Sequence, residues 1–411
     1  MNQALLGLPA IIFIAWILSA NRAAFPWRIV LTGLAAQLLL ATLFLKVTVL
    51  QDALLVVNRM VLAVEAATAQ GTAMVFGFLG GGEAPFDVTN PQNTFVLAFR
   101  ALPLVLVFAA LSALLWHWRV LPLIISGLAK LLTKSMRLSG AVGMSAAASI
   151  FIGMVESPLL IKPYLARMSR AELFMLMTCG MATVAGTVLA LYAGILSPLL
   201  PSALSHILVA SLISAPAALL LAAVIIPPQS SRPEETQALT SNYGSSMEAL
   251  VQGTSEGVRL LANIVAMLIV FVALVHLIDI MLGLIPGTDE PLTLIGMFGT
   301  IFMPLAWLMG IPWQEAGTAG ELLASKVFIN ELVAYLNMAA LPPAALSDHS
   351  QLIMTYALCG FANFGSLGIM IGGLSALCPQ RAQDIVKLAP LSVVSGMLAT
   401  CMTGCIVGLV V

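Results

Sequence analysis

The chain has 411 residues, of which 60% are apolar and only 9% carry a charged side chain. Soluble globular domains carry a charged fraction of about a quarter, so the composition excludes that class and predicts a polytopic membrane protein. The formal net charge of −1 supplies no basic surface, and we expect no nucleic acid partner. The five cysteines lie inside apolar segments without metal-site spacing, which favours packing roles over disulfides or ligands.

The first predicted unit, residues 1–92, contains two spans and a surface segment. Residues 1–22 lack the basic region and cleavage site of a signal peptide, so they are expected to be a retained span. A second span is predicted at 29–45. Residues 52–65 have apolar side chains at helical spacing with polar interruptions, typical of an interfacial helix. The glycines and prolines of 77–91 predict a loop.

The second predicted unit, residues 93–226, contains a long apolar span at 95–118 and an amphipathic helix at 121–138. Later in the unit, residues 173–200 form a span broken by glycines, and 207–226 form an uninterrupted one. Each apolar stretch is close to the ~20 residues that a helix needs to cross a bilayer.

Between these helices lies an apolar segment that is interrupted by a carboxylate and two prolines, Phe151 to Pro163 (FIGMVESPLLIKP). Residues 141–163 are therefore predicted to be a re-entrant hairpin, because irregular backbone at membrane depth needs surrounding protein or a water-filled cavity. An ionisable side chain at that depth is costly, which makes Glu156 a functional candidate. The alternative is an acid that merely faces an aqueous surface.

A polar linker and the start of a helix, together residues 227–257, precede the last predicted unit, residues 258–411. In that unit we expect a span at 258–284, an interfacial segment at 292–309, a loop at 310–322, a helix at 323–338 and two spans at 352–377 and 385–411. The whole chain then has about eight transmembrane helices, with two interrupted segments.

The two halves share a weak internal repeat. Each half has a carboxylate in an interrupted apolar segment, Glu156 or Glu331, followed by a glycine-containing helix. The patterns are Cys179–Ala185 (CGMATVA) and Cys359–Gly365 (CGFANFG). Paired interruptions in corresponding positions indicate the midplane site of a secondary transporter. Small residues that only allow close helix packing are the alternative interpretation.

Enzyme signatures are weak. Gly253–Gly257 matches a G-x-S-x-G pattern, but a polar linker precedes it where a nucleophile elbow needs a buried strand. The chain has neither a Walker A loop nor an H-E-x-x-H motif. We therefore expect no enzyme activity and no cofactor, and an ion gradient is the expected energy source.

The motifs resemble those of the concentrative nucleoside transporters over nearly the whole chain. They are LAFRAL (97–102), MSAAASIFIGMVESPLLIKP (144–163), GMATVAGTVLALY (180–192), ASLISAP (210–216), NELVAY (330–335) and ALCGFANFGSLGIMIGG (357–373). The resemblance implies a homotrimer in the cytoplasmic (inner) membrane. Each all-α protomer would have eight transmembrane helices, two re-entrant hairpins, interfacial helices and an inverted repeat. It also implies symport of nucleosides with sodium, or in some members protons, by an elevator-type movement.

The resemblance also assigns site residues. Glu331, Asn363 and Ser366 match ribose-binding positions, with Phe361 lining the same pocket, and Glu156 and Val188 match positions beside the nucleobase. The sodium site corresponds to Ser149, the backbone of Ile152, Thr183 and the backbone of Val184, whose oxygens suit a hard cation.

Two departures from the family pattern bear on the substrate and the ion. Met154 and Val155 replace polar residues that would bond the base, and Ser149 replaces an asparagine of the sodium site. We therefore expect altered base recognition, with Glu156 buried among Met154, Val155 and Leu159. The alternatives are a proton-coupled transporter of another nucleoside-like or sugar-containing substrate, and a non-transporting membrane component of the same fold.

Overall fold

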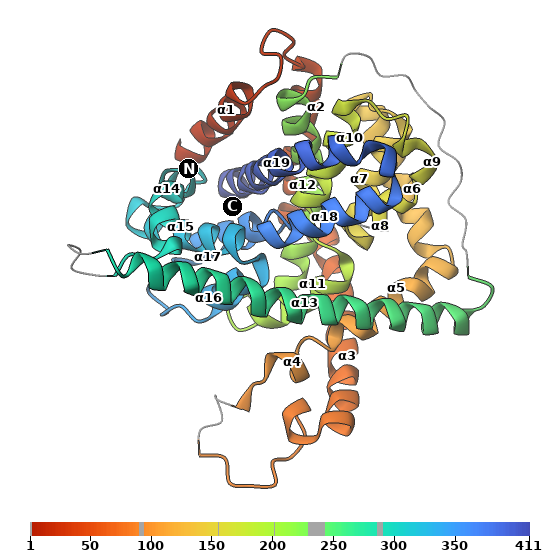
Figure 1. Ribbon diagram of the computed structural model, residues 1–411, viewed down its shortest axis with the longest axis vertical. Coiled ribbons are helices and arrows are strands. Elements are labelled where there is room, and N and C mark those ends of the chain that lie inside the picture. Colours follow the sequence, from red (N-terminus) through yellow and green to blue (C-terminus); the bar gives the residue numbers. More distant parts are fainter. Residues whose placement is uncertain (1, 90–93, 155, 201, 229–242, 286–290) are drawn as a thin grey trace.

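The computed structural model describes residues 2–89, 94–154, 156–200, 202–228, 243–285 and 291–411. Within these ranges the regular elements are all helical. The two chain ends lie close together, with α1 (Asn2–Ile17) packed against α19 (Ala382–Val410) (Figure 1). An all-helical chain of this hydropathy agrees with the predicted membrane fold.

The N-terminal unit contains α2 (Trp27–Lys46), α3 (Thr48–Phe76), the short 3₁₀ helix η1 (Gly77–Gly80) and α4 (Leu97–Arg100). The helix predicted at 52–65 is the centre of α3, which has 29 residues and buries only Leu54, Thr68 and Thr72. The Thr72 hydroxyl donates to the Gly80 carbonyl over 2.9 Å, which fixes η1 against the end of α3. In Figure 1 α3 and α4 project below the body of the protein.

The first repeat follows α5 (Leu104–His117) and α6 (Val120–Met136). Its hairpin, here called hairpin 1, consists of α7 (Gly140–Ile152), α8 (Glu156–Leu159) and α9 (Lys162–Leu165). A capping box at Ser169 and Glu172 starts the next helix. That helix is broken at residues 183–185 into α10 (Arg170–Ala182) and α11 (Gly186–Leu196), and α12 (Ala203–Ile225) completes the repeat.

The second repeat has the same order of elements. After α13 (Ser246–Leu282) and α14 (Leu294–Leu308), its hairpin, here called hairpin 2, consists of α15 (Trp313–Phe328) and α16 (Glu331–Ala339). A helix broken at residues 359–363 into α17 (Asp348–Leu358) and α18 (Phe364–Leu377) follows, and the 3₁₀ helix η3 (Pro379–Arg381) leads into α19. Figure 1 shows α7 to α9 and α14 to α17 on opposite sides, with α12 and α19 between them.

The prediction of a loop at 310–322 was wrong, because α15 begins at Trp313. The glycines that suggested a loop allow close helix packing instead: a Cβ on Gly320 would collide with the Gly299 carbonyl of α14. The helix predicted at 323–338 was also wrong as one unit, since it is interrupted at Ile329 and Asn330. Pro304 lies inside α14 without ending it.

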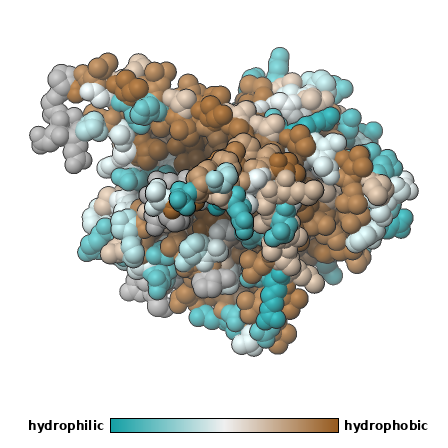
Figure 2. Space-filling view, turned by 90° about the horizontal axis from the view of Figure 1, so that it is seen from below, coloured by the Kyte–Doolittle hydropathy of each residue, from teal (hydrophilic) through white to brown (hydrophobic). Residues whose placement is uncertain are grey.

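Six segments of the described chain are long and apolar enough to cross a membrane: Trp27–Lys46, Leu97–His117, Arg170–Leu196, Ala203–Ile225, Ser246–Leu282 and Pro379–Val410. The two further spans predicted from the sequence correspond to α1, which has 16 residues, and to the broken pair α17 and α18. Much apolar surface stays exposed, as the broad brown areas of Figure 2 show on one face. On α13, for example, Ile269 is 65% exposed, which suits contact with lipid or another protomer.

The G-x-S-x-G match is a helix-packing motif. A Cβ on Gly253 would lie 2.7 Å from the Ala113 Cβ and 2.8 Å from the Ala109 carbonyl oxygen of α5. A Cβ on Gly257 would lie 3.0 Å from the Ala109 Cβ. Two glycines four residues apart therefore let α13 and α5 approach closely, as in membrane helix pairs.

We predict that Gly253→Ala lowers the unfolding temperature in detergent, because the added methyl group overpacks the α5–α13 contact at a cost of about 1–3 kcal/mol. The matched control is Gly127→Ala on α6, where a Cβ would meet nothing within 4 Å and better helix propensity should preserve stability. Equal melting temperatures for the two variants would contradict this role of Gly253.

Candidate functional site

The break in hairpin 2 places a buried carboxylate at the start of a helix. Asn330 caps α16, and its side-chain oxygen accepts from the Val333 N–H over 2.9 Å. Glu331 is the first residue of α16 and is 5% exposed. A negative charge is favourable near a helix N-terminus, where backbone N–H groups point outward. The turn therefore both positions and stabilises the Glu331 carboxylate.

Side chains from both halves of the protein meet this carboxylate. The Tyr192 hydroxyl of α11 donates to Glu331 Oε1 over 2.6 Å. The Asn363 amide, from the break between α17 and α18, donates to Glu331 Oε2 over 2.8 Å. Burying a charge is costly unless it is hydrogen-bonded, so these two donors are what allow Glu331 to stay inside the protein.

The orientation of Asn363 is fixed by the helix that it starts. Its side-chain oxygen accepts from the Ser366 N–H over 2.7 Å as the N-cap of α18, which leaves the amide nitrogen for Glu331. Ser366 is 6% exposed, and Phe361 lies half-buried in the same break. The structure therefore brings Glu331, Asn363 and Ser366 together at the junction of two interrupted segments.

The site can exchange hydrogen bonds with hydroxyl groups. An ionised carboxylate offers about four lone-pair sites, and two donors are placed on Glu331 by the protein. A ligand hydroxyl can donate to a remaining site, and the serine hydroxyl of Ser366 can donate or accept. A polyhydroxyl ligand such as a sugar fits this chemistry.

Tyr192 was missed by the sequence interpretation. It ends the quoted motif at 180–192, but only Val188 in that motif was assigned a role beside the ligand. The signal was present, because residues four apart on a helix share one face and Val188 and Tyr192 are so spaced on α11. The Tyr192 ring also packs against Tyr335 at 5.2 Å between ring centroids.

Hairpin 1 differs from the prediction in the burial of its acid. We expected Glu156 to lie among apolar neighbours, but Glu156 is exposed and Leu159 is 49% exposed. The chain turns at Gly153 with φ of +99°, and a Cβ there would lie 2.7 Å from Glu156 Oε2. This sharp turn precedes the Glu156 carboxylate, which is exposed at the tip of hairpin 1 and not buried.

Met154 occupies the interior position instead. It is 7% exposed and its Cβ would lie 2.8 Å from a Cβ on Gly180 of α10, so it fills the space that this glycine leaves. Val188 is 3% exposed. Val155, the other apolar replacement, lies outside the described residues.

Two of the predicted sodium residues, Ser149 and Thr183, meet where α7 contacts the break between α10 and α11. The Thr183 hydroxyl donates to the Ser149 carbonyl over 3.2 Å and to the Cys179 carbonyl over 2.9 Å. Ile152 is the last residue of α7, so no later N–H group of that helix donates to its carbonyl oxygen. Val184 lies in the break itself. Hydroxyl and carbonyl oxygens form the donor set that a hard cation prefers.

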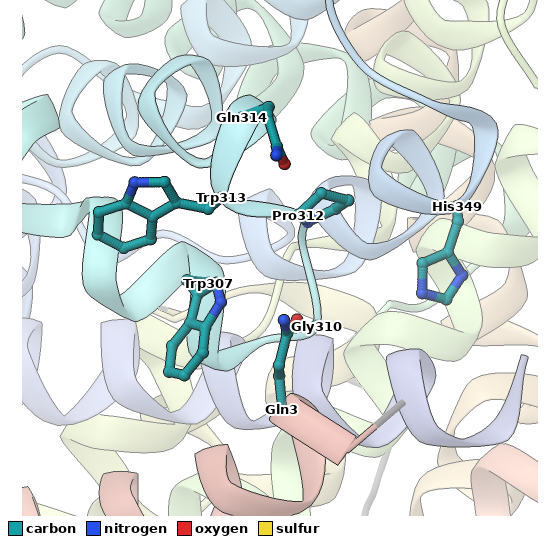
Figure 3. Close-up of a pocket in the computed structure, with 7 residues that line it drawn as sticks. All are labelled: Gln3, Trp307, Gly310, Pro312, Trp313, Gln314 and His349. Carbon is teal, nitrogen blue, oxygen red and sulfur yellow. The ribbon is translucent and has the colours of Figure 1, made fainter.

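A separate surface cavity of about 700 Å³ contains none of these residues. Figure 3 shows its lining, which comes from α1 (Gln3), the end of α14 (Trp307), the following turn (Gly310 and Pro312), the start of α15 (Trp313 and Gln314) and the start of α17 (His349). The described residues contain no group of three or more histidine, cysteine or acidic side chains that could hold a metal ion.

All five cysteines are buried and none forms a disulfide in the described part of the chain. Their burial agrees with the packing role that their apolar surroundings suggested.

Three protein-family models together match almost the whole chain. Residues 6–79 match the model described as "Na+ dependent nucleoside transporter N-terminus", residues 98–199 match "Nucleoside recognition", and residues 206–408 match "Na+ dependent nucleoside transporter C-terminus". The chain belongs to the concentrative nucleoside transporter family. The predicted family, all-helical fold, membrane location and absence of an enzyme role are thereby confirmed.

Related transporters align with nearly the whole of this chain. The nucleoside permease NupC of Helicobacter pylori is 36% identical, with 98% of this chain and 96% of the permease covered. An uncharacterised transporter of Haemophilus influenzae is 38% identical over 99% of this chain and 97% of its own length. Solute carrier family 28 member 3 of Rattus norvegicus is 35% identical over 98% of this chain and 58% of its own length.

Solved structures of one family member match the fold closely. CNTnw in an inward-facing, substrate-bound state gives a TM-score of 0.88 at 36% identity and covers 100% of this chain and 98% of that chain. A doubly substituted CNTnw variant in an outward-facing state gives a TM-score of 0.91 at 37% identity. This match covers 100% of this chain and 97% of that chain. The protein is therefore a multi-pass nucleoside transporter of the cytoplasmic membrane.

We predict that Tyr192→Phe weakens nucleoside binding by roughly 10- to 100-fold, because a hydrogen bond to a charged group contributes about 1.5–3 kcal/mol. The substitution keeps the ring contact with Tyr335, and equilibrium binding to purified protein measures the change. Tyr335→Phe is the control, since its hydroxyl donates to the Thr355 carbonyl rather than to Glu331. Equal dissociation constants for the Tyr192→Phe and Tyr335→Phe variants would contradict a specific role of Tyr192.

Proposed function

We propose that this transporter is a secondary active symporter that imports nucleosides or nucleoside-like compounds, driven by a sodium gradient. The observation that carries the proposal is the buried Glu331 carboxylate, paired with Asn363 where hairpin 2 meets the break between α17 and α18. In this proposal Glu331, Asn363 and Ser366 bind the sugar. The name of the Helicobacter pylori relative, a nucleoside permease, supports the same substrate class.

The base-binding side is proposed to be atypical. Of the residues assigned there, Met154 and Val188 are buried and apolar. A base has donors and acceptors that these side chains cannot pair, at a cost of roughly 1–3 kcal/mol for each group left unsatisfied. Glu156 and Val155 complete the assignment, with Glu156 supplying the polar group at the tip of hairpin 1. We infer selection by base shape and by the sugar rather than by a dense set of base hydrogen bonds.

We predict that Glu331→Gln and Asn363→Ala each abolish uptake of radiolabelled nucleosides into proteoliposomes, because each removes a group that binds the sugar and leaves its partner unpaired. Glu315→Gln is the control, since this half-buried acid of α15 accepts a hydrogen bond from the Ser347 hydroxyl and lies outside the proposed site. Uptake at the wild-type rate by both site variants, with the control unchanged, would contradict the sugar-site assignment.

Sodium is proposed to bind where hairpin 1 meets the break between α10 and α11. Ser149 and Thr183 are 1% exposed and contribute oxygens there, as do the backbone carbonyls of Ile152 and Val184. The family models that match this chain carry sodium dependence in their descriptions. A proton carried by Glu156 is the competing coupling ion.

We predict that Thr183→Val raises the sodium concentration for half-maximal uptake at least about tenfold, the equivalent of one lost hydrogen bond or ligand. Thr178→Val on the same helix is a matched control, because the buried Thr178 hydroxyl has no hydrogen-bond partner among the described residues. Uptake that follows a proton gradient and ignores sodium would instead favour coupling through Glu156.

The transport cycle is proposed to be an elevator-type movement in a homotrimer. Residues 93–226 and 258–411 would supply the two repeats with the moving hairpins and broken helices. Residues 1–92 would supply part of the scaffold, and residues 227–257 the linker and the start of α13. The similarity to both inward-facing and outward-facing CNTnw structures supports alternating access. The exposed apolar faces of α3 and α13 support contact with lipid and neighbouring protomers. Light scattering of the purified protein would give the number of protomers.

A further inference from the structure

Hairpin 2 contains a second buried charge that the sugar site does not use. Lys326, on α15, is 0% exposed, and Lys326 and Glu331 are the two charged side chains classed as buried within the described chain. Its Nζ donates to the Ala357 carbonyl and to the Thr400 hydroxyl oxygen, both over 2.8 Å. A buried ammonium is costly unless it is paired or hydrogen-bonded, so its position in the core calls for a specific role.

The two acceptors come from different helices. Ala357 lies in the last turn of α17, immediately before the break that presents Asn363, and Thr400 lies in the middle of α19. The last carbonyls of a helix have no partners within it, and positive charge is favourable at that end of the helix. Lys326 therefore caps the broken end of α17 and joins α15, α17 and α19.

The corresponding elements of the first repeat meet in the same way. There the hairpin arm is α7, the broken helix is α10 and the long following helix is α12. The Thr183 hydroxyl, at the end of α10, donates to the Ser149 carbonyl of α7. The Val184 N–H donates to the Ser211 hydroxyl of α12 over 3.3 Å. This junction carries no buried ammonium, and its hydroxyl and carbonyl oxygens are those that we propose to bind sodium.

We propose that Lys326 is the covalently attached cation of the second repeat. It takes the place that the coupling ion takes in the first repeat, and it holds hairpin 2 against the broken end of α17 so that Glu331 and Asn363 meet. Lys326 is thus a positioning residue for the sugar site. The comparison with the ion rests on the proposed function, whereas the contacts of Lys326 do not.

The proposal implies that the two junctions respond differently to the coupling ion. A bound ion can leave, so the contact of hairpin 1 with the α10–α11 break depends on the ion concentration. An ammonium on a side chain cannot leave, so the sugar-binding half stays assembled when the ion is absent. Lys326 and Glu331 lie on the two arms of hairpin 2, on either side of its break.

The test measures equilibrium binding of radiolabelled uridine or adenosine, whichever the wild type binds, to purified full-length protein. Lys326→Met keeps most of the stem volume and removes the charge, and we expect the dissociation constant to rise about tenfold or more. Lys387→Met, at an exposed position of α19, should bind as the wild type does. A Lys326→Met dissociation constant within twofold of the wild type would overturn the proposal.

A charge-specific rescue separates positioning by the ammonium from simple packing. Lys326→Ala should lose binding, and n-propylammonium should restore part of it whereas n-propanol should not. Equal rescue by the two compounds would show that only volume matters and would overturn the proposal. If neither Lys326 variant folds, Thr400→Val tests the same contact: weaker binding supports the proposal and unchanged binding overturns it.

Glu331→Gln, measured in parallel, distinguishes the two proposals. Normal nucleoside binding by Glu331→Gln would reject the sugar-site assignment whatever the Lys326 variants do. Loss of binding by Glu331→Gln together with wild-type binding by Lys326→Met would reject the role of Lys326 alone.

Discussion

The site depends on one buried carboxylate and the two donors that satisfy it. Glu331 stays inside the protein because Tyr192 and Asn363 each donate to one of its oxygens, over 2.6 and 2.8 Å. Tyr192 belongs to the first repeat and Asn363 to the second. Both hydrogen bonds to the Glu331 carboxylate therefore form only when the two halves of the protein are in place. Removing either donor would leave a buried charge partly unpaired, which costs more than the bond itself contributed. The same dependence makes the site sensitive to the relative position of its elements.

Interrupted helices supply the polar groups in a protein of this hydropathy. A helix that crosses a membrane uses its own backbone groups, and free carbonyls and N–H groups are tolerated only where protein or water surrounds them. The breaks at 183–185 and 359–363 lie inside the fold, where hairpins 1 and 2 cover them. Each break is tied to a hairpin arm and to a long helix, through Thr183 and Val184 in the first repeat and through Lys326 in the second. The repeat therefore builds two similar junctions, one of which contains Lys326 whereas the other is proposed to bind sodium.

Much of this arrangement followed from the sequence, because glycine, proline and carboxylate residues are conspicuous in apolar segments. The interruptions near Glu156 and Glu331 and the polar residues Asn363 and Ser366 could be found in this way. Tertiary packing was less accessible. The glycines of α15 indicated a loop, yet Gly320 serves close packing against α14. The exposure of Glu156 depends on the turn at Gly153, which no side-chain pattern encodes. The hydrogen bond between Tyr192 and Glu331 could not be predicted from the sequence, because the two residues lie 139 positions apart.

The most direct test of the sugar site compares equilibrium binding of a nucleoside and of its dideoxy analogue, which lacks both free ring hydroxyls of the ribose. The comparison is made on the wild type and on Glu331→Gln. If the carboxylate binds those hydroxyls, the analogue should bind the wild type at least about tenfold more weakly, and this difference should largely disappear in Glu331→Gln. An equal preference for the hydroxyl-bearing nucleoside in both proteins would contradict the central claim that Glu331 recognises the sugar.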